Sequence, residues 1–334
     1  MAKTTIAIVH GDPAGIGPEL LIKLLSDKKT TDRANILVIG DPKVFLRGEN
    51  TVGYQIENVC HITNIKDLNF SNCNVNHLDI NFEGIDGVPT AAVSATGGAS
   101  TIGGLHRALE LSKNGYVAGI VFMPFNKESM HLGGNDFNDE LGYASQFFKL
   151  KTRASEFNFA NGMWNGRVTS HVAMKDVHNL LNEDLICEEI ALTNQTLELA
   201  GYDRPRIVVS AYNPHAGDGG LMGREEIDVI APAIKRMKQK QISVNGPLPA
   251  DTLWLKVRDG EYDAVVTMYH DQGQIAIKLL GFDRGVTILA GLPIDIAGQN
   301  KANIVPTQNA FIMAVNMAEH RKSTDGVVSN QNEY

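Results

Sequence analysis

The segment DAVVTMYHDQGQIAIK, residues 263–278, decides the fold class. Its apolar, β-branched run from Ala264 to Met268 has the character of a buried strand, and the run gives way to His270 and Asp271. Similar runs recur near residues 5, 35, 118, 167, 206 and 285, with helix-like stretches between several of them. Alternating strand and helix signals predict an α/β protein with a largely parallel sheet.

The composition is that of a globular protein. The chain has 334 residues, which favours two domains, and 43% of them are hydrophobic and 20% charged. A net charge of -8 without long runs of one sign argues against general binding of nucleic acid or of anionic membranes. No apolar run is long enough to predict a transmembrane helix. The three cysteines form no CxxC motif or regular framework, so we expect a reducing, cytoplasmic location.

Three histidines follow predicted strands. His171 comes after RVTS, His215 after RIVVSAYNP, and His270 after DAVVTMY. The carboxyl ends of parallel strands share one edge of a sheet, where ligands bind. Three imidazoles on neighbouring loops could therefore hold one divalent ion such as zinc, cobalt or nickel. The alternative is three unrelated loop histidines among the ten in the chain.

Two further strand ends carry polar or glycine-rich sequence. The segment GDPAGIGPE precedes a helix expected near Pro18, and its glycines would let a ligand approach the backbone. It is neither a GxGxxG nor a Walker A motif, and a tight turn explains it equally well. Lys127 follows the run VFMPFN and could bind a phosphate or a carboxylate, although a solvated helix start is the simpler interpretation.

These stretches together resemble one known family. The segments GDPAGIGPE, PFNKESMH, SHVAMKDV, NPHAGDGG with GREE, GPLPADT, YHDQGQ and DIAGQNKAN are similar to those of the 4-hydroxythreonine-4-phosphate dehydrogenase family. The resemblance includes a paralogous branch that acts on D-threonate or D-erythronate 4-phosphate. It implies two α/β domains with a cleft between them, as in isocitrate and isopropylmalate dehydrogenases. Residues 1–130 and 292–334 would form the cofactor-side domain, and residues 131–291 the domain of metal ligands and dimerisation.

The resemblance also implies an activity. Members of this family of pyridoxine biosynthesis use NAD, or NADP, and a divalent metal such as Zn, Co, Mg or Mn. They oxidise the secondary hydroxyl of a 4-phosphorylated four-carbon acid, and the β-keto acid then loses CO2. The family is a homodimer with a shared active site. Its metal ligands correspond to His171, His215 and His270.

Other residues take roles from the same resemblance. Asp251 and Lys278 would handle the proton and the anion in catalysis, although Asp251 could instead be a helix N-cap. The candidate substrate-binding residues are Lys278, Thr287, Glu140 and Lys127. The candidate cofactor-binding residues are Asp295 and Asn303, in DIAGQNKAN.

The chain departs from the family pattern at three places. GGNDFNDELGYAS, with Asp139 and Glu140, replaces a Gly-His-Thr-Glu stretch, and Thr287 replaces an asparagine. These two differences favour the paralogous branch. Members also carry a longer segment, with an Asp-His-Gly motif and a substrate-binding arginine, where this chain passes from Pro293 to Ile294; we interpret the difference as a mobile loop missing from this sequence. Two alternatives from other classes are a metal-dependent hydrolase or aldolase and a non-catalytic sugar-phosphate binding protein.

Overall fold

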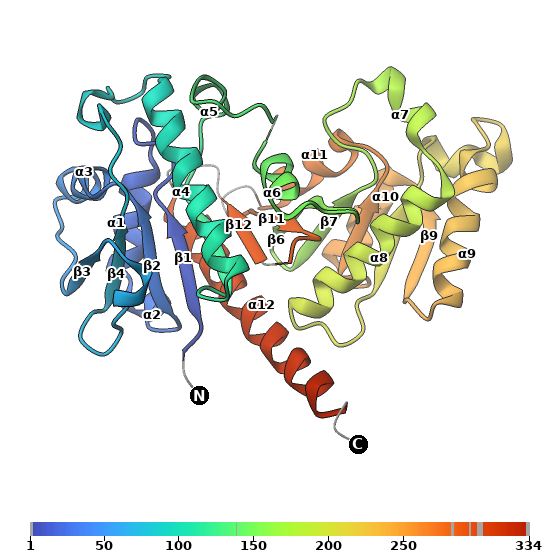
Figure 1. Ribbon diagram of the computed structural model, residues 1–334. Helices are drawn as coiled ribbons and strands as arrows, with labels where there is room; N and C mark the ends of the chain where they lie inside the picture. The colour runs from blue at the N-terminus through green and yellow to red at the C-terminus, as the bar shows by residue number, and fades with distance from the viewer. Residues whose placement is uncertain (1–2, 138, 282–283, 294, 299–302, 332–334) are drawn as a thin grey trace. The chain divides into compact units, whose positions relative to one another are not determined.

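The computed structural model describes residues 3–137, 139–281, 284–293, 295–298 and 303–331 (Figure 1). The chain forms two compact α/β units, Met1–Leu150 with Leu292–Tyr334, and Lys151–Gly291. The boundary expected at residue 130 therefore lies at Leu150. The reason is that helices α5 (Lys127–Leu132) and α6 (Glu140–Phe148) both contact α4 (Ala95–Lys113) of the first unit, α6 through a hydrogen bond of 2.8 Å between Tyr143 and His106.

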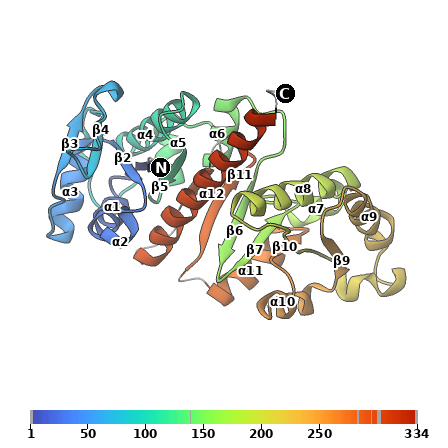
Figure 2. The ribbon, with the colours of Figure 1, turned by 90° about the horizontal axis from the view of Figure 1, so that it is seen from below.

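The first unit has a parallel sheet with strand order β3-β4-β2-β1-β5-β12. Helix α4 packs on one face of this sheet, and α1 and α12 lie on the other (Figure 2). The strands are β1 (Thr5–Val9), β2 (Asn35–Gly40), β3 (Val59–Ile62), β4 (Val75–Asp79), β5 (Gly119–Phe122) and β12 (Asp295–Gly298). The remaining helices are α1 (Gly17–Ser26), α2 (Lys28–Thr31), α3 (Pro42–Val52), α12 (Ile304–Gln331) and the short turns η1 (Ile65–Asp67) and η2 (Ile85–Gly87).

The second unit has strand order β11-β6-β7-β10-β8-β9. Strands β7, β10, β8 and β9 are parallel, whereas β6 is antiparallel to both of its neighbours. The strands are β6 (Ser155–Ala160), β7 (Met163–Arg167), β8 (Ile207–Ser210), β9 (Val244–Leu248), β10 (Ala264–Thr267) and β11 (Val286–Ala290). The helices are α7 (Met174–Leu180), α8 (Glu183–Leu199), η3 (Pro214–Gly220), η4 (Glu226–Ile230), α9 (Ala231–Gln239), α10 (Ala250–Arg258) and α11 (His270–Gly281).

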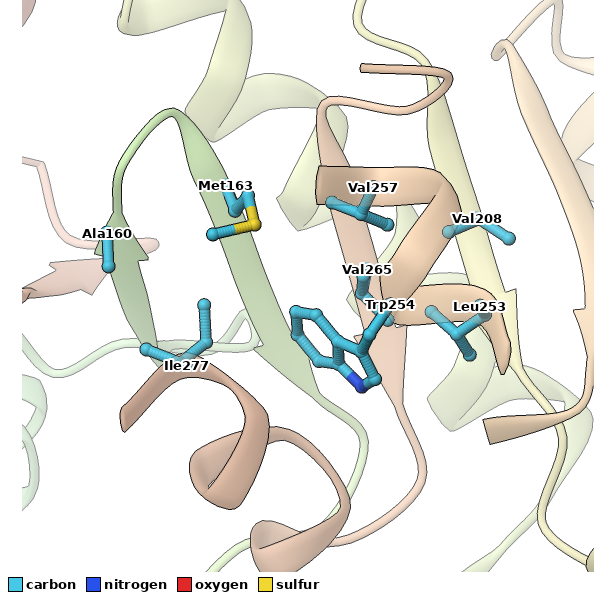
Figure 3. Close-up of a cluster of buried hydrophobic side chains, with 8 residues drawn as sticks. All are labelled: Ala160, Met163, Val208, Leu253, Trp254, Val257, Val265 and Ile277. Atoms are coloured by element: carbon cyan, nitrogen blue, oxygen red, sulfur yellow. The ribbon is translucent and has the colours of Figure 1, made fainter. Parts of the chain in front are cut away.

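The core of the second unit fixes two helices that begin at or next to candidate site residues. Trp254 of α10 and Ile277 of α11 pack with Val208 of β8 and Val265 of β10 in one buried cluster (Figure 3). Burying such side chains contributes roughly 1.5–3 kcal/mol each. Helix α10 starts beside Asp251 and α11 starts at His270, so this cluster sets where the two helix starts lie relative to the sheet.

Local sequence explains several element boundaries. The side chain of Asn182 accepts a hydrogen bond from the Leu185 amide at 2.9 Å and caps α8, whose first turn is acidic. Asp41 caps α3 in the same way, at 2.9 Å from the amide of Lys43. Helix α12 continues through the polar sequence after Arg321 as far as Gln331.

Two observations bear on the cellular setting. Cys60 and Cys73 form a disulfide, with Cα atoms 5.7 Å apart, and Cys187 is a buried free thiol. The disulfide removes the cysteine pattern as an argument for a reducing compartment. Among the described residues, no helix is both long enough and apolar enough to cross a membrane.

Candidate active site

The three predicted metal-binding histidines follow three neighbouring parallel strands. His171 lies after β7, His215 after β8, and His270 is the first residue of α11, directly after β10. In the sheet, β10 lies between β7 and β8 and pairs with both. The histidine loops therefore leave adjacent strands at the same edge.

Hydrogen bonds join these loops to one another. The amide and the hydroxyl of Thr169 donate to the carbonyl of Met268, at 3.1 and 2.7 Å. The side chain of Gln272 accepts from the Met268 amide at 2.7 Å and donates to the carbonyl of Ala211, also at 2.7 Å. The glutamine of the YHDQGQ segment thus connects the ends of β10 and β8, a role that the sequence did not reveal.

His171 and His270 come close together. Their ring centroids lie 5.5 Å apart with the planes inclined by 41°. The His270 Nδ1 shares a hydrogen bond with the Asp271 carboxylate at 2.7 Å. His171 and His215 are exposed and His270 is partly exposed. Among the described residues, nitrogen atoms of all three histidines do not converge within 4.8 Å, so a common ion would require their side chains to turn inward.

The His215 loop has an unusual backbone held by a buried carboxylate. Residues His215–Gly219 all have positive φ angles, between 44° and 76°. Glu226, only 4% exposed, accepts hydrogen bonds from the amides of Tyr212 and Asn213 at 2.8 and 2.7 Å. A Cβ atom on Gly217 would lie 2.7 Å from the Glu226 carboxylate, so only glycine fits there. The GREE segment, which includes Glu226, therefore shapes the loop that presents His215.

A tyrosine and an acid flank the same loop. Tyr212 lies edge-on to Tyr269, with ring centroids 6.3 Å apart. Burial raises the pKa of the Tyr212 phenol, and the negative charge of Glu225 raises it further. Glu225 itself accepts a hydrogen bond from Asn213 at 2.5 Å and pairs with His178 at 3.0 Å. The Tyr212 phenol is therefore a neutral donor near pH 7.

Thr287 belongs to a polar network that reaches the YHDQGQ segment. The Asn158 amide donates to the Thr287 hydroxyl at 3.2 Å, and its oxygen accepts from Gln274 at 2.7 Å and from Arg167 at 2.9 Å. Arg167 is 1% exposed and also binds Glu156 at 3.0 Å. Burial lowers the pKa of Arg167, and the charge of Glu156 opposes that shift. The network fixes the orientation of the Thr287 hydroxyl.

Asp251 and Lys278 are both exposed on helices of the second unit. Asp251 lies in the first turn of α10, but Pro249 occupies the N-cap position, so the alternative interpretation of Asp251 as the N-cap is wrong. Lys278 lies in the last turn of α11, which begins at His270. The helix is continuous from His270 to Lys278, which separates these two residues by about 12 Å along the helix axis.

The remaining candidate residues lie in the first unit. Lys127 is the exposed first residue of α5, whose cap is Asn126, and Glu140 begins α6, whose cap is Asp139. The Asn303 side chain accepts from the Val305 amide at 3.1 Å, at the start of α12. The side chain of Asp295 and the position of Ile294 lie outside the described part of the chain, as does any test of the segment expected between Pro293 and Ile294.

The GDPAGIGPE segment forms a tight turn between β1 and α1. The Asp12 amide donates to the carbonyl of Pro124 at 2.9 Å, and the Asp12 carboxylate accepts from the Ala14 amide at 2.8 Å. The helix starts at Gly17, one residue before the expected Pro18. Both contacts join groups within the chain, as the interpretation of this segment as a tight turn predicts.

Comparison with known proteins gives this arrangement a context. The chain is 42% identical over 329 residues to a Pseudomonas aeruginosa protein provisionally named 4-hydroxythreonine-4-phosphate dehydrogenase 2, covering 95% of this chain and 97% of that protein. It is 35% identical over 298 residues to the D-threonate 4-phosphate dehydrogenase of Pectobacterium atrosepticum, covering 86% and 88%. The crystal structure of 4-hydroxythreonine-4-phosphate dehydrogenase from Klebsiella pneumoniae superposes with a TM-score of 0.83 at 32% identity, covering 95% of this chain and 98% of that one.

Fold and relatives define the class: this protein is an oxidoreductase of the dehydrogenase type. The sequence profile of the pyridoxal phosphate biosynthetic protein PdxA matches residues 32–314. The chain belongs to the PdxA family. The resemblance inferred from the short segments is thereby confirmed, together with the α/β fold.

Proposed function

We propose that this protein oxidises the secondary hydroxyl of a 4-phosphorylated four-carbon hydroxy acid with NAD as acceptor and a divalent ion bound by His171, His215 and His270. One observation carries the proposal: in a chain of this family, the three histidine loops leave adjacent strand ends and are joined through Met268 and Gln272. Membership of a dehydrogenase family supports the nicotinamide.

The residues present fit a divalent ion. Imidazole nitrogens are ordinary ligands of zinc and cobalt, and the exposure of these rings gives an ion access from solvent. The 5.5 Å between the His171 and His270 rings is a separation that two ligands of one ion can adopt after a side-chain rotation. When bound, the ion would supply Lewis-acid stabilisation of negative charge on the substrate hydroxyl, while the nicotinamide accepts the hydride.

The chain's own residues would divide the remaining tasks. Asp251 is an exposed carboxylate that can hold the hydroxyl proton, and Lys278 supplies a positive charge for the phosphate or the carboxylate. Thr287 offers a fixed hydroxyl. In the first unit, Lys127 and Glu140 would bind substrate, and Asp295 and Asn303 the cofactor. Decarboxylation of the β-keto acid, a homodimer with a shared site and a cytoplasmic location complete the proposal.

The candidate substrates differ at one carbon, which carries either an amine or a hydroxyl. 4-Hydroxythreonine 4-phosphate carries the amine, and D-threonate or D-erythronate 4-phosphate carries a hydroxyl there. An acidic side chain such as Glu140 could accept a hydrogen bond from either group. The similarity to the Pectobacterium atrosepticum protein supports the threonate branch as the alternative substrate class.

A panel of these three phosphorylated acids tests the proposal. Each is incubated with NAD and with added Zn²⁺, Co²⁺, Mg²⁺ or Mn²⁺, and NADH is followed by its absorbance. We expect NADH from at least one acid, and loss of the signal when a chelator is present. No NADH from any acid with any ion would overturn the proposal and favour a reaction that needs no nicotinamide.

A further inference from the structure

A second histidine cluster lies in the first unit, on its edge strands β3 and β4. His61 of β3 and His77 of β4 are direct partners in the parallel register, so their side chains share one face of the sheet. Asp79 lies two residues after His77 on the same strand and therefore on the same face. We propose that His61, His77 and Asp79 form a second metal site, for a divalent transition ion of the zinc, cobalt or nickel type.

The three ligand groups are already gathered. The Asp79 Oδ1 lies 2.6 Å from the His77 Nδ1 and 2.9 Å from the His61 Nδ1, and one ligand atom from each residue falls within a 4.8 Å span. Ligands around a tetrahedral zinc ion at Zn–N distances of about 2.0–2.1 Å lie roughly 3.3 Å apart. Moving each nitrogen away from the carboxylate oxygen by about 0.4–0.7 Å would reach that spacing, and one ion could then take the place of the two hydrogen bonds.

The donor types also suit such an ion. Two imidazoles and one carboxylate are a common ligand set for zinc, and imidazole selects against calcium and magnesium. The His61 side chain is 46% exposed, whereas His77 is fully buried. The site therefore has a solvent-facing side through which an ion can enter and where water can complete the coordination.

His77 has the outer support that a metal-binding histidine needs. Its Nε2, on the far side of the ring from Asp79, lies 3.0 Å from the Nε2 of buried His10. With an ion on Nδ1, His77 carries its proton on Nε2 and donates it to His10, which fixes the ring. Gly40 makes room for that arrangement, because a Cβ there would lie 2.5 Å from the His10 ring. Phe45 packs edge-on against His77 at 5.1 Å between centroids.

The neighbouring disulfide does not supply ligands. Cys60 precedes His61 on β3, and successive residues of a strand point to opposite faces, so the Cys60 side chain lies away from the cluster. The proposed site is also distinct from the catalytic histidines, because those belong to the second unit. A test must nevertheless separate the two sites, since both would bind the same ions.

Zinc stoichiometry in matched variants tests the second site. The His171→Ala/His270→Ala double variant removes two ligands of the proposed catalytic ion and serves as the background. After equilibrium dialysis against Zn²⁺ we expect it to retain about one zinc ion per chain, measured by mass spectrometry of the metal. Adding His61→Gln should weaken that binding by about 100-fold or more, because loss of outer partners alone costs about 10–100-fold.

His106→Gln in the same background is the matched control. His106 has the same exposure as His61 and also lies near a carboxylate, at 3.6 Å from Glu110, but it is not in the cluster. We expect this variant to keep its zinc. Equal zinc affinity with and without His61, or a background variant that binds no zinc, would overturn the proposal.

Thermal unfolding provides a second measurement, and circular dichroism shows whether each variant is folded. Because His61 is exposed, His61→Gln should keep the circular dichroism spectrum of the background. Zinc should then raise the melting temperature of the background and of the His106→Gln control but not that of His61→Gln. Equal zinc-induced shifts in all three proteins would also overturn the proposal.

Discussion

The two histidine clusters differ in how the backbone presents their ligands. In the second unit, His171 and His215 sit on loops with left-handed backbone, at φ 37° and 51°, and their rings reach solvent. In the first unit, His61 and His77 are extended strand residues whose nitrogen atoms already bind Asp79. The strand cluster of His61, His77 and Asp79 is therefore already gathered, whereas the loop cluster of His171, His215 and His270 would have to converge around an ion.

The largest effect should come from removing the loop ligands. We expect His171→Ala/His270→Ala to lower kcat/KM by at least about 100-fold, since in the proposed function both imidazoles hold the ion that stabilises the reacting oxygen. The measurement is NADH formation with the preferred phosphorylated acid and metal. The His106→Gln variant should retain wild-type activity. A double variant with nearly normal kcat/KM would show that the loop cluster is not the catalytic one.

A smaller effect should follow from loosening one loop. Glu226→Gln removes the charge from the carboxylate that binds the Tyr212 and Asn213 amides. We expect the free energy of unfolding to fall by about 2 kcal/mol, because each of the two hydrogen bonds changes from a charge-assisted one, worth about 1.5–3 kcal/mol, to a neutral one, worth about 0.5–1.5 kcal/mol. Urea unfolding measures this, with exposed Glu188→Gln as control. Zinc bound at His61, His77 and Asp79 should be unaffected; if it too is lost, the two clusters are not independent.

The next effect concerns the recognition of the negative charge of the substrate by Lys278. Lys278→Ala should weaken the preference for a phosphorylated over a non-phosphorylated acid by roughly 1.5–3 kcal/mol, the range for a charge-assisted hydrogen bond. Metal binding should stay intact, because the lysine is not a ligand. The ratio of the two kcat/KM values gives the result, and exposed Lys238→Ala provides the control. An unchanged ratio would make Lys278 a solvated residue of α11.

The smallest effect concerns an ion pair at the amino ends of β8 and β10, opposite the ends that carry the histidine loops. Arg206 and Asp263 precede β8 and β10 and pair at 2.6 Å. Burial raises the pKa of Asp263, but the hydrogen bonds from Arg206 outweigh it and hold the pKa below its ordinary value. A lowered folded-state pKa means that the stabilisation is complete above the unfolded pKa and disappears as the pH falls through the folded pKa.

Comparison of Asp263→Asn with the wild type across pH checks this sign. We expect the variant to be less stable by up to about 1 kcal/mol at pH 7, as for other exposed pairs, and the difference to shrink in acid. Urea unfolding at pH values from neutral to about 3 supplies the curve. The exposed Asp203→Asn variant is the control. A difference that grows as the pH falls would contradict the assignment.

Strands with continuous apolar, β-branched sequence were predictable. The runs AVVT of β10 and IVVS of β8 are buried on both faces, so their sequence alone indicates central parallel strands. Strands β3, β4 and β6 were not expected, because VCHI, VNHLD and SEFNFA mix polar and apolar residues. The antiparallel direction of β6 follows from its hairpin with β7, which the sequence pattern did not indicate.

The sequence indicated the histidine cluster of the second unit but not that of the first, and the difference again depends on which strands could be predicted. The histidines of the second unit each follow an apolar run, so the rule for strand ends places them at one edge. His61 and His77 meet only through the register of two strands that were not predicted. The spacing of His77 and Asp79 was a usable signal, since residues two apart on a strand share a face. Their link to His10 depends on the order of strands across the sheet.

The strand order of the second unit also bears on how the protein is synthesised. Along the chain β7 comes first, β8 follows and β10 comes last, yet β10 lies between the other two and pairs with both. A nascent chain leaving the ribosome therefore carries the loops of His171 and His215 before the strand that joins them exists. Until residues 264–267 have emerged, β7 and β8 have no common neighbour in the sheet. The three histidine loops can thus take their places on adjacent strands only after most of the second unit has been made.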